Sequence, residues 1–185
     1  DEVKITNPNF LPGICHFIDQ FKIKVIGWSP GGDMPSEVTR QLWMKDGATD
    51  SKLKYIDSRH LYINHMDPLE SVITIFNRQI GDKDHGDKSL LGGEICVWND
   101  RAGHCQEDIL LMNPVYPAML AFAERSWRGG GEPGWTATIG ISGTVNTAKF
   151  TEFENRLLDQ KEQRFKEMPF PYQKQAATVW SFYGP

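Results

Sequence analysis

The sequence predicts an α/β fold in which parallel strands form one sheet and helices lie outside it. Apolar runs of strand length alternate with longer segments whose apolar residues recur at helical spacing, and glycine-rich loops separate the two kinds of segment. The chain has 185 residues, a hydrophobic content of 39% and a formal net charge of -4, which is typical of one folded domain. No internal repeat is evident.

The first predicted elements are a helix and a strand. Asn7 and Pro8 predict a helix start, because asparagine caps the N–H groups of a first turn and proline fits at its first position. The apolar residues that follow at helical spacing are Phe10, Ile14, Phe17, Ile18 and Phe21. Residues 24–28 then predict a short buried strand that ends at Trp28, and the Ser-Pro-Gly-Gly sequence of residues 29–32 predicts a loop.

Two further strands and a helix are expected in the middle of the chain. Residues 38–44 predict a strand that ends near Trp43, residues 45–54 are a polar stretch, and residues 59–64 form the next apolar run. Asp67 and Pro68 predict the start of a helix that should end near Gly81. Its apolar face consists of Leu69, Val72, Ile73, Phe76 and Ile80.

The second half of the chain predicts one strand and two helices. Residues 90–98 predict a buried strand that ends at Trp98 and passes into a polar loop. Residues 113–122 have helical spacing, and residues 123–127 predict either a strand or a helix that ends before three glycines. Residues 147–166 predict the longest helix, whose apolar face we expect to pack on the sheet.

The composition and the absence of common motifs exclude several classes of protein. The chain is mildly acidic and has no run rich in lysine and arginine, so we expect no nucleic-acid or anionic-membrane partner. No apolar run is long enough to span a bilayer, so we expect no membrane insertion. Three cysteines without C-x-x-C spacing indicate neither a disulfide framework nor a zinc site. Glycine-rich phosphate-binding motifs and the G-x-S-x-G hydrolase motif are also absent from the sequence.

Tryptophan recurs at the ends of the predicted strands. Trp28, Trp43 and Trp98 each end one, and Trp127 is a fourth candidate. In a (β/α) barrel the carboxyl ends of the strands face one mouth, where such folds place their active sites. Indole rings at that mouth would line one pocket, and large aromatic side chains suit flat or sugar-like ligands. Taken alone, the stretch that ends in Trp98 would be explained better as a core strand followed by an ordinary turn.

Together, these and other motifs resemble one family, the family 20 glycoside hydrolases, which are β-N-acetylhexosaminidases. In the family's order, the motifs are Asp1-Glu2, Val25-Ile-Gly-Trp28, Gln41-Leu-Trp43, Tyr62-Ile-Asn64, Gly93-Glu-Ile-Cys-Val-Trp98 and Ala123-Glu-Arg-Ser-Trp127. The resemblance covers nearly the whole chain. It implies that residues 1–185 are a single fragment, the second half of a catalytic TIM (β/α)8 barrel with about four β/α units, parallel strands and outer helices.

The resemblance implies a catalytic pair at the start of the chain. Asp1 and Glu2 match the Asp-Glu pair that closes the fourth barrel strand in the family. Glu2 would be the general acid/base, and Asp1 would orient the acetamido group of the substrate. In this family that acetamide, rather than an enzyme carboxylate, attacks the anomeric carbon. The resemblance implies no cofactor and no metal.

The other site residues implied by the resemblance bind the sugar. Trp28, Trp43 and Trp98 would line the acetamide pocket, and the Tyr62 hydroxyl would bond the acetamide oxygen. Asn64 stands where many members carry Asp, and Asp100 where many carry a Glu that binds sugar hydroxyls. The residues assigned to the interior or packing of the barrel are Glu94, Cys96, Glu124 and Trp127.

The implied function is hydrolysis of terminal β-linked N-acetylhexosamine (GlcNAc or GalNAc) from glycans by a substrate-assisted retaining mechanism. A non-catalytic carbohydrate-binding module and a scaffold with a decayed active site stay open as alternatives. A half-barrel would have two open strand edges and a bare apolar interior, so we expect self-association or docking with the missing half-barrel, and negligible activity of the fragment alone. The family's usual substrates favour a secreted, periplasmic or lysosomal setting.

Overall fold

The structure is an α/β arrangement built on one parallel sheet. A computed structural model describes residues 7–45, 47, 49–64, 66–98, 104–132 and 145–172. Within these residues the strands are β1 (Ile26–Ser29), β2 (Thr39–Leu42), β3 (Tyr55–Asp57) and β4 (Leu90–Gly93). All four are parallel and pair in the order β1-β2-β3-β4, so β1 and β4 form the two edges of this sheet. The predicted α/β class with a parallel sheet is therefore confirmed.

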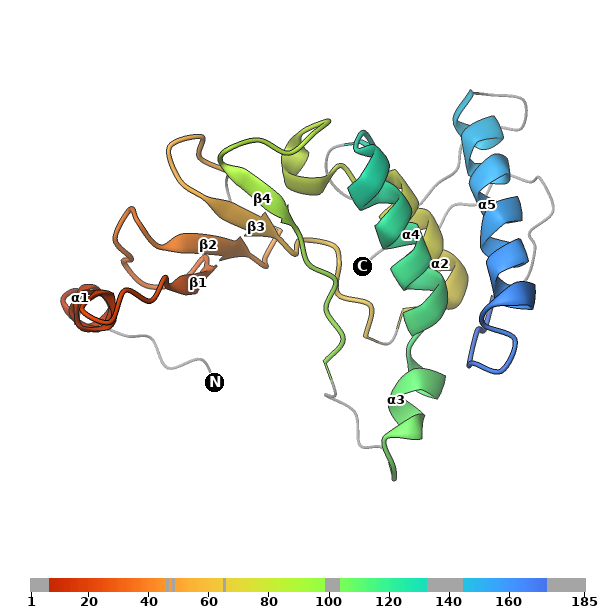
Figure 1. Cartoon of the computed structure of the whole chain (residues 1–185), viewed down its shortest axis with the longest axis horizontal. Coiled ribbons are helices and arrows are strands. Elements are labelled where there is room, and N and C mark those ends of the chain that lie inside the picture. The colour runs from red at the N-terminus through yellow and green to blue at the C-terminus, as the bar shows by residue number, and fades with distance from the viewer. Residues whose placement is uncertain are drawn as a thin grey trace.

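The helices lie beyond the two edges of this sheet. They are α1 (Phe10–Asp19), α2 (Pro68–Asn77), α3 (Glu107–Met112), α4 (Val115–Arg128) and α5 (Val145–Gln163), and a 3-10 turn, η1 (Ile80–Asp82), follows α2. Figure 1 shows α2, α4 and α5 side by side at one end of the sheet, with α1 at the other end near β1. The main helical layer is therefore next to the β4 edge.

The connections between the first three strands differ from the predicted strand-helix units. Residues 30–38 join β1 to β2 as a loop, and the described residues between β2 and β3 contain no helix. Arg40 holds the first loop, since its guanidinium donates to the carbonyl oxygens of Met34 (2.6 Å), Pro35 (3.0 Å) and Val38 (3.3 Å). The loop predicted after Trp28 is therefore confirmed, and the described residues of these two connections do not supply the outer helices that the resemblance implies.

The third strand lies earlier in the chain than the sequence predicts. β3 comprises Tyr55–Asp57, directly after the polar stretch, whereas the apolar run of residues 59–64 predicts the strand there. Residues 59–64 instead continue beyond β3 as an irregular extension, in which Tyr62 forms an isolated parallel bridge with Cys96. A three-residue strand is too short to show alternation in a sequence, which explains why it is missed.

The helix predictions are confirmed in position more than in length. α2 begins where predicted, because Asp67 Oδ1 accepts the backbone N–H groups of Leu69 (2.9 Å) and Glu70 (3.4 Å). It ends at Asn77 rather than near Gly81, which instead adopts the left-handed φ of 65° within η1. α4 continues as a helix through residues 123–127, so the alternative of a strand there is wrong. α3 lies in a segment for which the sequence predicts no element.

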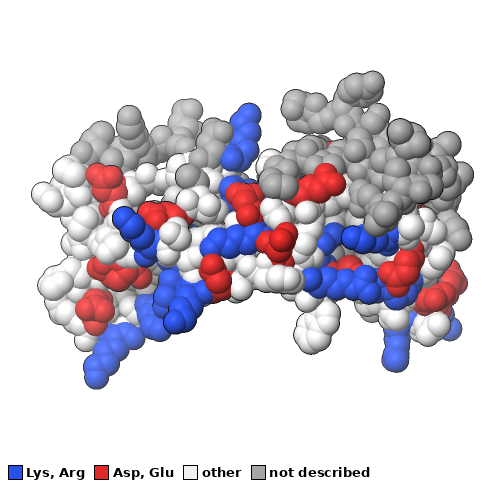
Figure 2. All heavy atoms as spheres, turned by 90° about the horizontal axis from the view of Figure 1, so that it is seen from above, with Lys and Arg blue, Asp and Glu red and all other residues white. Residues whose placement is uncertain are grey.

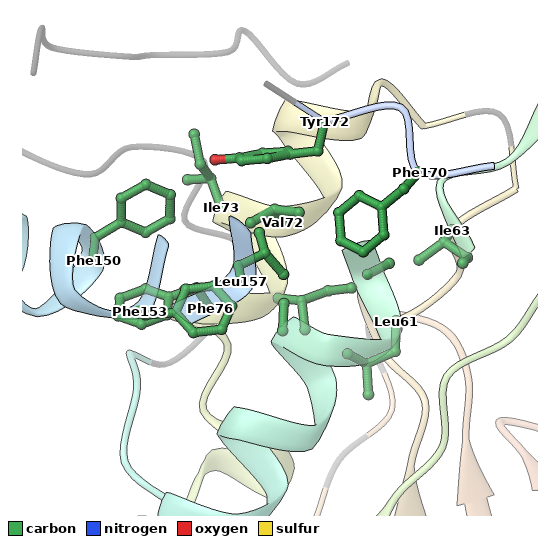
Figure 3. Close-up of a cluster of buried hydrophobic side chains, with 13 residues drawn as sticks. Leu61, Ile63, Val72, Ile73, Phe76, Phe150, Phe153, Leu157, Phe170 and Tyr172 are labelled. Carbon is green, nitrogen blue, oxygen red and sulfur yellow. The ribbon is translucent and has the colours of Figure 1, made fainter. Parts of the chain in front are cut away.

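The main hydrophobic core lies among the helices. Figure 3 shows side chains of α2 and α5 packed together with Leu61 and Ile63 from the extension of β3. The ring centroid of Phe76 in α2 lies 5.2 Å from that of Phe150 and 5.1 Å from that of Phe153 in α5. The apolar face of α5 therefore packs on a helix, where the sequence predicts the sheet. A smaller core on one face of the sheet consists of Leu42, Tyr55 and Leu90, with Ile80 packed against it.

A buried ionic cluster connects β3 with α2 and η1. The Asp57 carboxylate is fully buried and accepts hydrogen bonds from Arg59 Nε (2.8 Å), Arg78 Nη2 (2.7 Å) and the Gly81 backbone N–H (2.6 Å). Asp82 also bonds both guanidinium groups, at 2.9 Å from Arg59 and 3.4 Å from Arg78. Burial by itself raises the pKa of Asp57, but the Arg59 hydrogen bond, the charges of both arginines and the Gly81 N–H outweigh it and hold this pKa below its ordinary value.

Asp57→Asn is expected to destabilise the fold by about 3–5 kcal/mol, because it removes the one fully buried carboxylate that two buried arginines share and leaves them only the partly exposed Asp82. Equilibrium denaturation by urea measures this loss. The matched control is Glu162→Gln on the exposed part of α5, which should change stability by less than about 0.5 kcal/mol. Equal stabilities of the two variants would contradict the role given to Asp57.

The same cluster predicts a specific loss of stability in acid. Because the folded-state pKa of Asp57 is depressed, its contribution is present above the ordinary pKa of 3.8 and is lost as the pH falls through the lower folded value. Stability measured against pH should therefore fall below this ordinary value more steeply in the wild type than in Asp57→Asn. Parallel acid limbs for the two proteins would argue against the assignment.

Charges of both signs are interspersed on the surface. Figure 2 shows lysine and arginine side chains alternating with aspartate and glutamate across one face, and the whole chain carries a formal net charge of -4. None of the helices in the described part combines the length and the apolar character that crossing a bilayer requires.

Candidate functional site

The candidate site lies at the carboxyl edge of the parallel sheet. Trp28 is near the end of β1, Trp43 directly follows β2, and Trp98 ends the segment that continues from β4. Because the strands are parallel, their carboxyl ends lie at the same edge. That edge is where ligands bind in folds built from parallel strands.

The three indoles form one cluster, which we call the tryptophan cluster (Trp28, Trp43 and Trp98). Trp28 is its centre: its ring centroid lies 6.2 Å from that of Trp43 and 6.3 Å from that of Trp98. The first pair is close to perpendicular, with an angle of 80° between the ring planes, and the second is tilted by 51°. Trp28 is 42% exposed and Trp98 is 52% exposed, so both present apolar surface to a ligand.

Trp43 is held by the loop that follows β1. Its indole Nε1 donates to the carbonyl oxygen of Pro30 (3.1 Å), and its backbone N–H donates to the carbonyl oxygen of Ser29 (3.2 Å). Gly31 lets this loop turn tightly, since a Cβ there would collide with the carbonyl oxygen of Trp28. The edge-to-face contact between Trp28 and Trp43 therefore depends on hydrogen bonds to the backbone and on a tight turn, as well as on the packing of the two rings.

Tyr62 and Asn64 approach Trp98 through the extension of β3. The Cys96 N–H donates to the Leu61 carbonyl (2.9 Å), and the Ile63 N–H donates to the Cys96 carbonyl (2.9 Å). This pairing brings Asn64 beside Trp98, whose backbone N–H donates to Asn64 Oδ1 at 3.1 Å. The structure thus brings together the predicted residues Trp28, Trp43, Tyr62, Asn64 and Trp98.

The Tyr62 hydroxyl is set up as a neutral hydrogen-bond donor. Burial is the main cause that raises the pKa of Tyr62 to about 12, and the charge of Cys96 and a hydrogen bond with Cys96 raise it further. A hydrogen bond with Trp98 acts in the opposite direction. Burial also raises the pKa of the Cys96 thiol, which contacts the Ser58 and Tyr62 side chains. Cys96 is only 6% exposed, so its assignment as an interior residue is confirmed. Glu94, assigned to the barrel interior, is exposed here.

A buried glutamine beneath the cluster is a residue that sequence reasoning missed. Gln41 pairs with Trp28 in the register of β1 and β2 and is only 7% exposed. Its Nε2 donates to the Ser58 hydroxyl at 3.0 Å, and Ser58 in turn contacts Cys96. The one available signal was a polar residue inside the strand Gln41-Leu-Trp43, since a buried amide needs a partner.

Three predicted site residues lie outside the described residues: Asp1, Glu2 and Asp100. No group of three or more histidine, cysteine or acidic side chains in the described ranges could hold a metal ion. The predicted site residues that are described supply aromatic faces, a phenol and an amide, and these groups are suited to recognition of a ligand.

Two residues assigned to barrel packing are placed differently. Trp127 lies near the carboxyl end of α4 and is 91% exposed, so the prediction that it packs in the barrel is wrong. Glu124 is on the same helix and forms ion pairs with Arg128 (3.1 Å) and Arg156 (2.9 Å). The charge of Glu124 is paired as predicted, but Glu124 lies in a helix and not at the end of a strand.

The fold and the cluster define the chain as an α/β protein with an aromatic, ligand-accessible surface at the carboxyl edge of a parallel sheet. No family model, curated protein or solved structure matches the chain.

The Tyr62 phenol should ionise at about 12 instead of at the ordinary value of 10.0. Absorbance titration of tyrosinate in the wild type, minus the same curve for Tyr62→Phe, isolates this group, and Tyr116→Phe serves as the control. Because the fold favours the neutral phenol, the stability it contributes is complete below the ordinary pKa and is lost as the pH rises through the raised one. A difference curve centred on the ordinary value would contradict the proposed environment.

Proposed function

We propose that the chain is part of a glycosidase resembling the β-N-acetylhexosaminidases of glycoside hydrolase family 20, and that it forms the second half of a (β/α)8 barrel. The activity would be removal of terminal β-linked N-acetylhexosamine from glycans. The observation that carries this proposal is the tryptophan cluster, met by Tyr62 at the carboxyl edge of a parallel sheet. That edge is where a barrel enzyme builds its site.

The geometry suits an acetamide group. Its methyl and planar amide would pack against the indoles, and its oxygen would accept a hydrogen bond from the neutral Tyr62 hydroxyl. An acetamide held in this way is restricted to one orientation, which favours intramolecular attack on the anomeric carbon. Asn64 contributes by holding Trp98 through its Oδ1.

In the proposed reaction Glu2 donates a proton to the leaving glycosidic oxygen while the acetamide oxygen bonds the anomeric carbon. Asp1 stabilises the positive charge that develops on the acetamide nitrogen. Water then attacks the anomeric carbon, Glu2 takes back a proton, and the acetamide is restored with retained configuration. Asp100 would accept hydrogen bonds from sugar hydroxyls. The reaction requires no metal or organic cofactor.

A second candidate is carbohydrate binding without catalysis, either as a binding module or as a scaffold with a decayed site. The high exposure of Trp28 and Trp98 favours it, because open indole faces can stack on sugar rings without enclosing them. Only the enzyme would require Glu2, as its proton donor. Carbohydrate binding would require only the tryptophan cluster.

The two candidates separate with N-acetylglucosamine thiazoline, a mimic of the cyclised intermediate, titrated by calorimetry into the protein that contains this chain within a complete barrel. We expect Trp98→Ala to weaken binding at least about tenfold, as the loss of a buried aromatic contact usually does. Glu2→Gln should keep most of the binding and lose turnover of an aryl N-acetylglucosaminide. Absence of thiazoline binding to the wild type would refute the enzyme proposal, and unchanged turnover in Glu2→Gln would refute the role of Glu2.

We also propose that the exposed face of the sheet is covered by the other half of a barrel or by a second copy of this chain. Ile26 is 56% exposed and, two residues before Trp28, lies on the same face of β1, and Leu91 in β4 is 55% exposed. Phe17 in α1 and Phe21 just after this helix contact each other yet are also exposed. Apolar surface of this extent usually marks an interaction site.

The chain alone should therefore associate at micromolar concentration in sedimentation velocity and should hydrolyse aryl N-acetylglucosaminide negligibly. Ile26→Lys should shift it towards the monomer, because a charge on the exposed sheet face opposes its burial. Leu111→Lys on α3 is the matched control, since Leu111 is 66% exposed and lies away from the sheet. A monodisperse wild-type monomer would contradict the proposed association.

A further inference from the structure

A ligand-sized hollow lies between α4 and α5. Its volume is about 540 Å³, and it shares no residue with the tryptophan cluster. Its floor is apolar, formed mainly by Leu120, Phe153 and Leu157, and Trp127 lines it from near the end of α4. We call this hollow the α4–α5 groove.

The backbone near Trp127 is held by hydrogen bonds, whereas its indole is exposed to solvent. It is 91% exposed, the highest value among the exposed large apolar side chains of the described residues. The helix end that carries it is tied down, because the Gly129 N–H donates to the Arg125 carbonyl (2.9 Å) and the Gly130 N–H to the Asp84 carbonyl (2.7 Å). Exposed indole on a rigid backbone can stack on a ligand at a low cost in conformational entropy.

The one basic side chain that lines the groove, Arg156, is already paired. Arg156 donates two hydrogen bonds to Glu124, at 2.9 and 3.0 Å, and a further 2.6 Å bond to Glu152. Arg128 also pairs with Glu124, at 3.1 Å. The lining of the groove therefore offers no unpaired positive charge that would attract a phosphate or a nucleic acid.

Beyond Arg156 on the same helix, the groove is lined by groups that bind hydroxyls. Asp159, Gln160 and Gln163 are exposed on α5 and line the groove. A carboxylate accepts hydrogen bonds and an amide both donates and accepts them, which matches adjacent hydroxyl and acetamido groups on a sugar ring. A pyranose has one face made of C–H groups, and this face can lie on an indole.

We propose that the α4–α5 groove is a second glycan-binding site that takes a neutral β-linked N-acetylhexosamine chain, with one sugar ring stacked on Trp127. This identification of the ligand rests on the function proposed above. The groove would hold part of a polymeric substrate away from the tryptophan cluster and so raise the local concentration of chain ends.

The test is affinity electrophoresis of the full chain in native gels with and without glycol chitin, a soluble polymer of this chemistry. Trp98→Ala removes the main site, and we expect this variant still to be slowed by the polymer. Adding Trp127→Ala should remove the remaining retardation, with a rise of about tenfold or more in apparent Kd. Trp127→Phe in the same background should keep part of it, because an aromatic face remains.

Each other result overturns the proposal. If Trp98→Ala alone abolishes retardation, no second site exists; if the double variant is slowed as much as Trp98→Ala, Trp127 does not bind the polymer. Loss of self-association in Trp127→Ala, measured by sedimentation with retardation unchanged, would show that a protein surface covers the indole instead. Thermal unfolding of every variant confirms that it is folded. Thiazoline binding is measured separately, so failure of the main site and failure of the groove are distinguishable.

Discussion

The buried carboxylate of Asp57 is the interaction on which the arrangement of the sheet and the helices depends. It receives Arg59 from the chain just after β3, Arg78 from the end of α2, and the backbone N–H of Gly81 from η1. Removing a carboxylate from water costs several kcal/mol, and only well-placed partners offset that cost. The three partners therefore have to meet at one point, which fixes the end of α2 against the end of β3.

The contacts of Asp57 also determine where the candidate site lies. Arg78 Nε also donates to the Arg59 carbonyl oxygen (3.1 Å), so the backbone that leaves β3 is held at its first residues. That backbone continues to Tyr62 and Asn64, and its hydrogen bonds with Cys96 place Trp98. The buried ionic cluster around Asp57 thus positions the side chains that we propose to bind the ligand, and it explains why the extension of β3 keeps its place without regular strand geometry.

The two aromatic surfaces suit different tasks. In the tryptophan cluster the indoles contact one another and meet a phenol whose pKa is raised to about 12, so the cluster offers apolar faces beside a neutral hydrogen-bond donor. In the α4–α5 groove a single open indole lies near polar side chains of α5, and we propose that a ring within a longer chain binds there. We propose saccharides for both surfaces because saccharides are polar ligands with apolar faces.

The sequence by itself determined the features that depend on neighbouring residues. Asp67 caps α2 because its carboxylate reaches N–H groups two and three residues away, and the apolar spacing of α5 and the tryptophans at strand ends are visible in short windows. Only the tertiary structure decided where β3 lies and that Trp127 is exposed instead of packed. Each of these depends on contacts between residues that are distant in the chain or on how completely two helices close over a side chain, and local patterns carry no information about either.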